Sequence, residues 1–202
     1  KPIPNPACLQ PPYLLKSKYH SNPSVFIPIS CILFNKTSYL SSRWLPPTNS
    51  PTFGWHLTNL NEYMKTTPVQ PENVKWGNKE LRPLGVGMGT KGLPGGLSGV
   101  DRFVRIAYLK SKFPVSEDLL SGISQFFHML NNVAMPRGAV ISEGSDDITL
   151  YSSCMCQQKG IYYYSTYNNN GVSAVDMNKE DLDGKEIKRF EYLDKLNILY
   201  QN

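Results

Sequence analysis

The chain has 202 residues, enough for one globular domain with a core, and 40% of them are hydrophobic while 18% are charged. This balance excludes a wholly disordered chain, which would be poorer in apolar residues. The net charge is +5, but the basic residues are scattered, so they form no footprint for nucleic acid. No stretch approaches the roughly 20 apolar residues of a transmembrane helix. We therefore expect neither a nucleic-acid partner nor a membrane partner.

Residues 1–47 differ in composition from the rest of the chain. No Asp or Glu precedes Glu62, and ten of the sixteen prolines fall within residues 1–51. A soluble domain normally mixes both charge signs over its surface. Two explanations stay open here: a weakly structured, Pro-rich segment, or a stretch read in a shifted frame or from a truncated gene.

The four cysteines do not form a zinc-binding pattern, which needs C-x-x-C spacing and a second pair. Cys154 and Cys156 share one face of a predicted strand at a separation of roughly 7 Å, too far for a disulfide. With Cys8 and Cys31 they are interpreted as free thiols of a reducing compartment, which predicts a cytoplasmic protein. We expect no metal and no cofactor.

Helices are predicted in the middle of the chain. A short one is expected over 55–64, and a loop over 85–99, which holds seven glycines. An amphipathic helix is expected over 100–112. Another follows, with Ser116 as its N-cap and apolar residues at i, i+3, i+4 and i+7 spacing; these are Leu119, Leu120, Ile123, Phe126, Phe127, Leu130 and Val133. His128, beside them, is expected to be half-buried.

Strands are predicted at the end of the chain, where aromatic and β-branched residues dominate. They cover 148–155, 160–167 and 172–178, with Asn- and Gly-containing turns between them, and a last strand is expected over 186–193. The run Tyr162 to Tyr164 suggests a stacking platform for bases, but consecutive strand residues alternate faces, which favours packing on both sides of a sheet. Helices followed by an antiparallel meander indicate an α+β fold.

Two polar residues are candidates for a site. Asn49, in T-N-S-P, can serve a turn through its own backbone or can donate a hydrogen bond to a developing oxyanion. Arg102 follows the glycine-rich loop. It is either a surface Arg, solvated or salt-bridged to Asp101 or Glu117, or a cation aimed at an active site. The loop is not a dinucleotide fingerprint, because no clear parallel strand precedes it. No G-x-S-x-G elbow occurs in the chain.

Five blocks, taken in order, resemble the choloylglycine hydrolase family of bile salt hydrolases and penicillin V acylases. They are TNSPTFGWHLTNLNEYM from Thr48, GVGMGTKGLPGGLSGVDRFVRIAYLK from Gly85, ISQFFHMLNNVAMPRG from Ile123, TLYSSCMCQQKGIYYYSTYNNN from Thr149 and AVDMNKEDLDG from Ala174. The G-L-P-G and Y-S-S-C…K-G-I-Y-Y-Y segments are the most specific. The similarity covers residues 48–202 and starts abruptly, which favours a frameshift or truncation as the origin of residues 1–47.

The resemblance implies part of an N-terminal-nucleophile hydrolase fold, an αββα sandwich of antiparallel sheets between helices. It implies hydrolysis of linear carbon–nitrogen amide bonds, as in conjugated bile salts or penicillin V, by an N-terminal Cys whose own α-amino group is the base. It also implies a homo-oligomer, since the family commonly forms tetramers. The chain alone is expected to be inactive, and the alternative is a non-catalytic fragment or an oligomerisation or binding module.

The resemblance places Asn49 at the family's oxyanion-region Asn and Arg102 at its active-site Arg. The nucleophilic Cys and its neighbours belong to an N-terminal portion that the chain lacks, and neither Cys8 nor Cys31 matches them. The family often has an acid where Gly96 stands and Ser where Asp101 stands. An acid beside Arg102 can pair with it and draw it away from a substrate.

Overall fold

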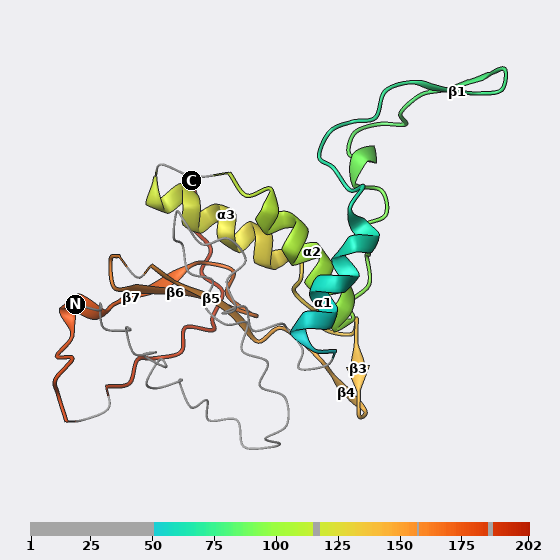
Figure 1. Ribbon diagram of the computed structural model, residues 1–202. Helices are drawn as coiled ribbons and strands as arrows, with labels where there is room; N and C mark the ends of the chain where they lie inside the picture. The colour runs from blue at the N-terminus through green and yellow to red at the C-terminus, as the bar shows by residue number, and fades with distance from the viewer. Residues whose placement is uncertain (1–50, 115–117, 157, 186–187) are drawn as a thin grey trace, which may run out of the picture.

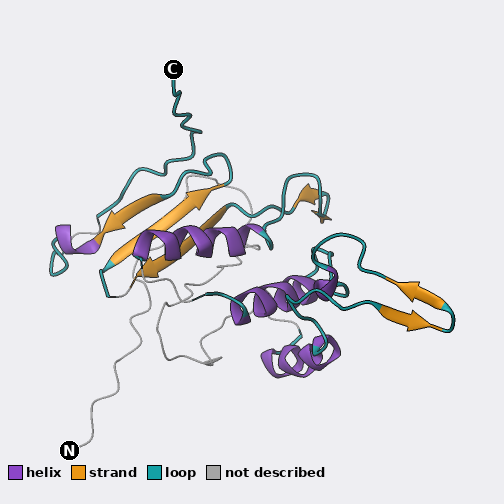
Figure 2. Cartoon of the chain, turned by 90° about the horizontal axis from the view of Figure 1, so that it is seen from above, coloured by secondary structure: helices purple, strands orange, loops and turns teal. Residues whose placement is uncertain are grey.

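The computed structural model describes residues 51–202 except 115–117, 157 and 186–187 (Figure 1). Three helices precede a three-stranded antiparallel sheet, and two short hairpins lie between these elements (Figure 2). This order confirms the predicted α+β layout. None of the described helices is long and apolar enough to cross a membrane.

Helix α1 (Phe53–Asn59) continues into the 3₁₀ helix η1 (Leu60–Tyr63), so the helix predicted over 55–64 is confirmed. It begins two residues early because Thr52 is its N-cap, and the Thr52 hydroxyl accepts a hydrogen bond from the Trp55 backbone N–H at 3.4 Å. Helix α1 packs on α2 through Phe53 and Phe103, whose rings lie edge to face with centroids 6.1 Å apart.

Helix α2 (Gly99–Ser111) follows the glycine-rich loop, which contains only a short 3₁₀ turn, η2 (Met88–Thr90). The Ser98 hydroxyl caps α2 by accepting a hydrogen bond from Asp101 N–H at 3.1 Å. The predicted loop and the predicted helix are therefore both confirmed.

Helix α3 (Leu119–Asn131) is confirmed, but its predicted N-cap is wrong. Ser116 lies outside the described residues, and the cap is Asp118, whose carboxylate accepts a hydrogen bond from Ser121 N–H at 2.8 Å. That bond is the main reason that the pKa of Asp118 lies below its ordinary value. His128 is exposed rather than half-buried, because it lies on the opposite side of α3 from the buried apolar residues.

The sheet consists of β5 (Tyr151–Cys156), β6 (Ile161–Thr166) and β7 (Ser173–Asp176), paired in that order. Helix α3 lies across one face of it (Figure 2). Cys154 pairs with Tyr163 in register, and both belong to the core that α3 completes. Tyr162 and Tyr164 stack on the other face with ring centroids 6.2 Å apart. The tyrosines therefore alternate faces, as the packing interpretation predicted.

The strand predicted over 186–193 is wrong. Residues 186–187 lie outside the described part, and residues 188–193 run as irregular backbone. Side chains at the end of β6 and in the turn after it hold this segment: Thr166 Oγ1 and Asn169 Nδ2 each donate to the Leu193 carbonyl at 3.3 Å. Asp194 accepts a hydrogen bond from Asn168 Nδ2 at 2.7 Å. Side-chain hydrogen bonds, rather than the expected strand ladder, therefore hold this segment.

Two hairpins were not predicted. The larger pairs β1 (Val74–Trp76) with β2 (Lys79–Leu81) and projects from the body as an arm (Figures 1 and 2). Gly77 makes its turn possible, because its φ of 58° lies in the left-handed region. The smaller pairs β3 (Ile141–Ser142) with β4 (Ser145–Asp146).

Candidate active site around Arg102

Arg102 lies in the first turn of α2, and its side chain is 3% exposed. Its Nε donates a hydrogen bond to the Val133 carbonyl, just after α3, at 2.9 Å. The interpretation of Arg102 as a solvated surface residue is therefore wrong. Its guanidinium is fixed where the first turn of α2 meets the end of α3, and charged groups are rarely this buried without a function or a partner.

Burial is the main reason that the pKa of Arg102 lies below its ordinary value; Asp147 acts in the opposite direction, and Arg105 adds to the lowering. An Arg guanidinium nevertheless stays protonated in proteins. The site thus holds a permanent positive charge in a largely desolvated place, where it interacts with an anionic group more strongly than it would in water.

Asp101 does not pair with Arg102. No ion pair joins Arg102 to a carboxylate in the part of the chain that the structure describes, and Glu117 lies outside that part. The Asp101 carboxylate turns instead toward Gly96 of the glycine-rich loop. Neighbouring helix residues project about 100° apart, so an acid at 101 faces the loop while Arg102 faces the interior.

Arg105, also on α2, links the elements around Arg102, and the sequence analysis missed it. Its Nη1 donates to the Pro94 carbonyl at 2.9 Å and also to the Gly96 carbonyl, and its Nε donates to the Asn132 carbonyl at 3.1 Å. It therefore ties the glycine-rich loop to the end of α3. The available signal was its i, i+3 spacing from Arg102, which places both arginines on one side of α2.

Asn49, the other predicted site residue, lies outside the described residues. The chain that follows it lies against α2, since the Phe53 ring contacts Phe103, the neighbour of Arg102. The His56 ring also stacks on Phe103 at a centroid distance of 4.4 Å, and burial lowers the pKa of His56. The segment after Asn49 is thus anchored beside Arg102, whereas the position of Asn49 itself stays a prediction.

The described cysteines are packing residues. Cys154 and Cys156 are buried thiols in the core between β5 and α3. Cys8 and Cys31 lie outside the described residues. The described part of the site therefore offers a fixed cation and no thiol of its own.

A buried guanidinium beside a loop suits chemistry in which negative charge develops on a bound group. The family model that matches residues 46–190 describes linear amide C–N hydrolases. That match covers most of the chain. The chain belongs to the choloylglycine hydrolase family.

Similarity to individual named proteins agrees with this family assignment. The chain is 47% identical over 156 residues to a bile salt hydrolase/transferase of Clostridium perfringens, covering 77% of this chain and 47% of that protein. It is 39% identical over 141 residues to a bile salt hydrolase/transferase of Lactiplantibacillus plantarum, covering 69% and 44%. The chain thus spans about half the length of the curated relatives it matches.

A solved structure supports the fold. A mutant of the conjugated bile acid hydrolase from Clostridium perfringens matches with a TM-score of 0.70 and 48% identity, over 77% of this chain and 47% of that one. The predicted fold class, a partial N-terminal-nucleophile hydrolase sandwich with antiparallel sheets, is confirmed. Residues 51–202, gaps aside, supply helices and the three-stranded sheet of it, together with the two short hairpins.

Proposed function

We propose that this chain carries the C-terminal part of the active site of an enzyme that hydrolyses the amide bond of conjugated bile salts. The observation that carries the proposal is the buried, fixed guanidinium of Arg102. The 47% identity to a protein named as a bile salt hydrolase supports a bile salt rather than a penicillin as substrate. Residues 48–202 form the family-like part, and residues 1–47 stand apart from it.

The chemistry needs a thiol that the N-terminal half of the relatives would supply. The thiolate attacks the amide carbonyl, and the C–N bond breaks as the amine leaves with a proton. Water then cleaves the thioester, releasing the acid and the thiol. Asn49 donates a hydrogen bond to the oxyanion, and Arg102 stabilises negative charge beside it. None of the residues that the structure describes supplies a thiol in that role, so we expect the 202-residue chain alone to be inactive.

We expect activity to appear when residues 48–202 follow the N-terminal half of the Clostridium perfringens enzyme in one polypeptide. The measurement is amine released from a glycine-conjugated bile salt, with phenoxymethylpenicillin as the competing substrate. The 202-residue chain and the N-terminal half, each alone, are the controls and should be inactive. A folded chimera without turnover, or turnover by the 202-residue chain itself, would contradict the proposal.

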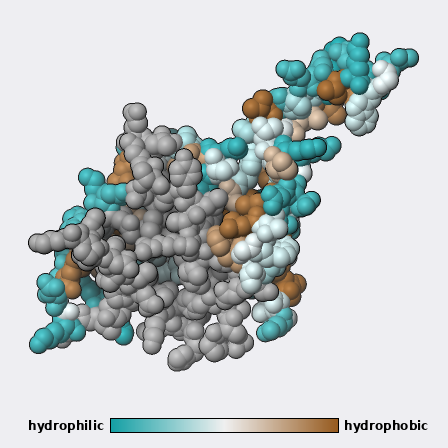
Figure 3. All heavy atoms as spheres, viewed as in Figure 1, coloured by the Kyte–Doolittle hydropathy of each residue, from teal (hydrophilic) through white to brown (hydrophobic). Residues whose placement is uncertain are grey.

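A second role, self-association into a homo-oligomer, is favoured by the arm. A lone two-stranded hairpin is marginally stable in water. The arm and the chain at its base nonetheless carry a series of exposed apolar side chains (Figure 3). These are Met64, Val69, Val74, Trp76, Leu84 and Val86, each more than half exposed. We infer that another copy of the chain covers them, with the family's tetramer as the expected assembly.

Replacing Trp76 by Ser is expected to shift the chain toward smaller species. Trp76 is 76% exposed, so replacing it costs the single folded chain little stability. An interface that covers Trp76 would instead lose a large aromatic contact. Light scattering behind size-exclusion chromatography measures the mass. Leu120→Ser, at a site on α3 that is 70% exposed, is the matched control. Equal masses for both variants and the parent chain would exclude the arm as the interface.

A further inference from the structure

Two arginines of α2 bind consecutive backbone carbonyls just after α3. Arg102 Nε donates to the Val133 carbonyl at 2.9 Å, and Arg105 Nε donates to the Asn132 carbonyl at 3.1 Å. The last carbonyls of a helix have no partner within the helix, and this end carries partial negative charge, so cationic donors suit it. The two arginines therefore share one short stretch of backbone as their anchor.

The two guanidiniums are not held equally. Within the described residues, the Arg102 side chain makes one hydrogen bond, the one to Val133. The Arg105 side chain makes three, since its Nη1 also donates to the Pro94 carbonyl at 2.9 Å and to the Gly96 carbonyl. A planar guanidinium that bonds acceptors on two segments cannot rotate without breaking some of these bonds. Arg105 is thus fixed from two sides, whereas Arg102 depends on a single acceptor.

We propose that Arg105 is a positioning residue that sets the direction of the Arg102 guanidinium. Its planar fork joins the Asn132 carbonyl to the glycine-rich loop, and this places the next carbonyl, that of Val133, as the acceptor for Arg102. The two placements are coupled because the two carbonyls belong to adjoining peptide units, and each unit is planar and stiff. A part for this placement in turnover rests on the function proposed above for Arg102.

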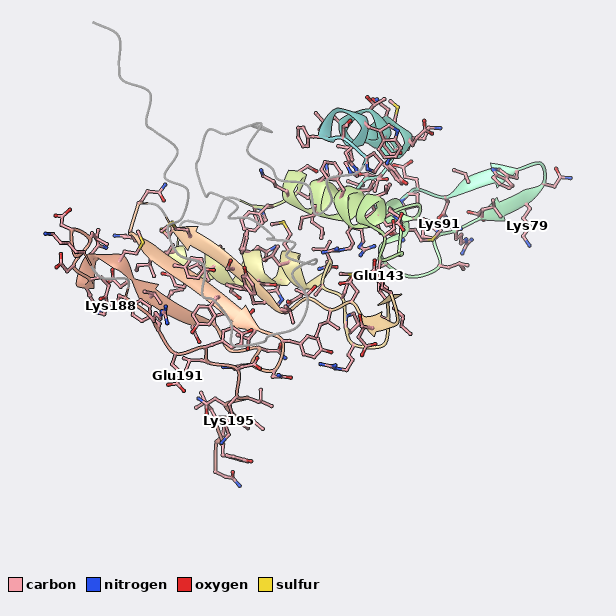
Figure 4. The ribbon with its side chains drawn as sticks, turned by 90° about the horizontal axis from the view of Figure 1, so that it is seen from below. Lys79, Lys91, Glu143, Lys188, Glu191 and Lys195 are labelled. Carbon is pink, nitrogen blue, oxygen red and sulfur yellow. The ribbon has the colours of Figure 1, made fainter. Side chains whose placement is uncertain are left out.

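Repulsion between the two cations makes these acceptors necessary. Burial is the main cause of the lowered pKa of Arg102, and the charge of Arg105 adds to the lowering, as expected for like charges close together. Without acceptors, the two guanidiniums would turn away from each other. The glycine-rich loop opposes this for Arg105, and Figure 4 shows the loop, labelled at Lys91, at the end of α2 that faces the arm. Freeing Arg105 from its acceptors should therefore also loosen Arg102.

The Nε–H group of Arg102 reports on this placement in the full 202-residue chain by NMR. Its signal is the arginine side-chain signal that Arg102→Lys removes, and its exchange with water follows the opening of the hydrogen bond to Val133. We expect Arg105→Met to raise this exchange rate by about tenfold, which corresponds to a loss of about 1.4 kcal/mol of local hydrogen bonding. Lys112→Met, at the exposed end of α2, is the matched control and should leave the rate unchanged.

Arg105→Lys distinguishes the planar fork from the charge. Lysine keeps the positive charge but has no planar fork to bond both segments, so it should raise the exchange rate of the Arg102 Nε–H nearly as much as methionine does. It also provides the test if Arg105→Met does not fold. Backbone N–H groups in the middle of α3, such as that of Phe126, should exchange at the parent rate in every variant.

Three results would overturn the proposal. The first is a parent exchange rate for the Arg102 Nε–H in a folded Arg105 variant. The second is a parent rate in Arg105→Lys alone, because charge would then suffice. The third is an equal rise for the α3 backbone, because Arg105 would then only stabilise the fold. The measurement needs no turnover, so a negative result here is distinct from an inactive chimera.

Discussion

Replacing Phe126 by Ala is expected to lower the free energy of unfolding by about 3–5 kcal/mol. Phe126 is 1% exposed in the core that α3 shares with the sheet, and this core includes Cys154 and Tyr163. The loss combines the transfer of a large ring with the cavity that remains behind it. Domains are usually stable by only about 5–15 kcal/mol, so one substitution removes a large part of the total.

Urea titration followed by far-UV circular dichroism measures this change, provided that the slope with denaturant is unchanged. Leu120→Ala is the control, because Leu120 lies on the same helix and is 70% exposed. It should change stability by no more than about 0.5 kcal/mol. Equal losses at the two positions would mean that α3 does not pack on the sheet through Phe126.

The helices and strands that were predicted correctly are those whose apolar or aromatic residues repeat with the period of that helix or strand. In α3 the buried side chains of Ile123, Phe126 and Leu130 follow the helical period, so the sequence alone indicates which side meets the core. Tyr163 and Tyr164 are likewise on opposite faces because β6 has a period of two. Leu120 was assigned to the same apolar side but is exposed, since the buried stripe of α3 is narrower than its apolar residues suggest.

The failures occurred where the deciding partner is distant in sequence. The burial of Arg102 depends on the Val133 carbonyl, 31 residues away, and a charged residue near a helix start gives no local sign of it. The segment over 186–193 was predicted as a strand, but side chains at the end of β6 and in the next turn, more than twenty residues earlier, hold the chain at Leu193. The arm was missed although Gly77-Asn78 is a two-residue hairpin signal, because its strands are only three residues long.

The resemblance supplied what periodicity could not. Helical spacing treats Arg102 as one more polar position, whereas the resemblance to choloylglycine hydrolases marked it as a candidate site residue. The structure then showed where the Asp101 carboxylate lies, which no motif indicates. The resemblance to the family therefore identifies Arg102 as a candidate, and the structure shows which groups hold its side chain.

Arg102→Met, made in the active chimera of residues 48–202, is expected to lower kcat/KM for a conjugated bile salt by about 100- to 1000-fold, the usual cost of removing one preorganised group that stabilises developing charge. Methionine fills similar space without charge. It also leaves the Val133 carbonyl without its donor, which costs about 1–3 kcal/mol of stability.

Thermal unfolding of the same samples separates the loss of stability from the loss of catalysis, because a variant that stays folded but turns over slowly has lost chemistry rather than structure. Lys112→Met, at an exposed site at the other end of α2, is the charge-matched control and should keep its rate. If Arg102→Met keeps the parent rate, the Arg102 cation has no part in the reaction and serves only to join α2 to the end of α3.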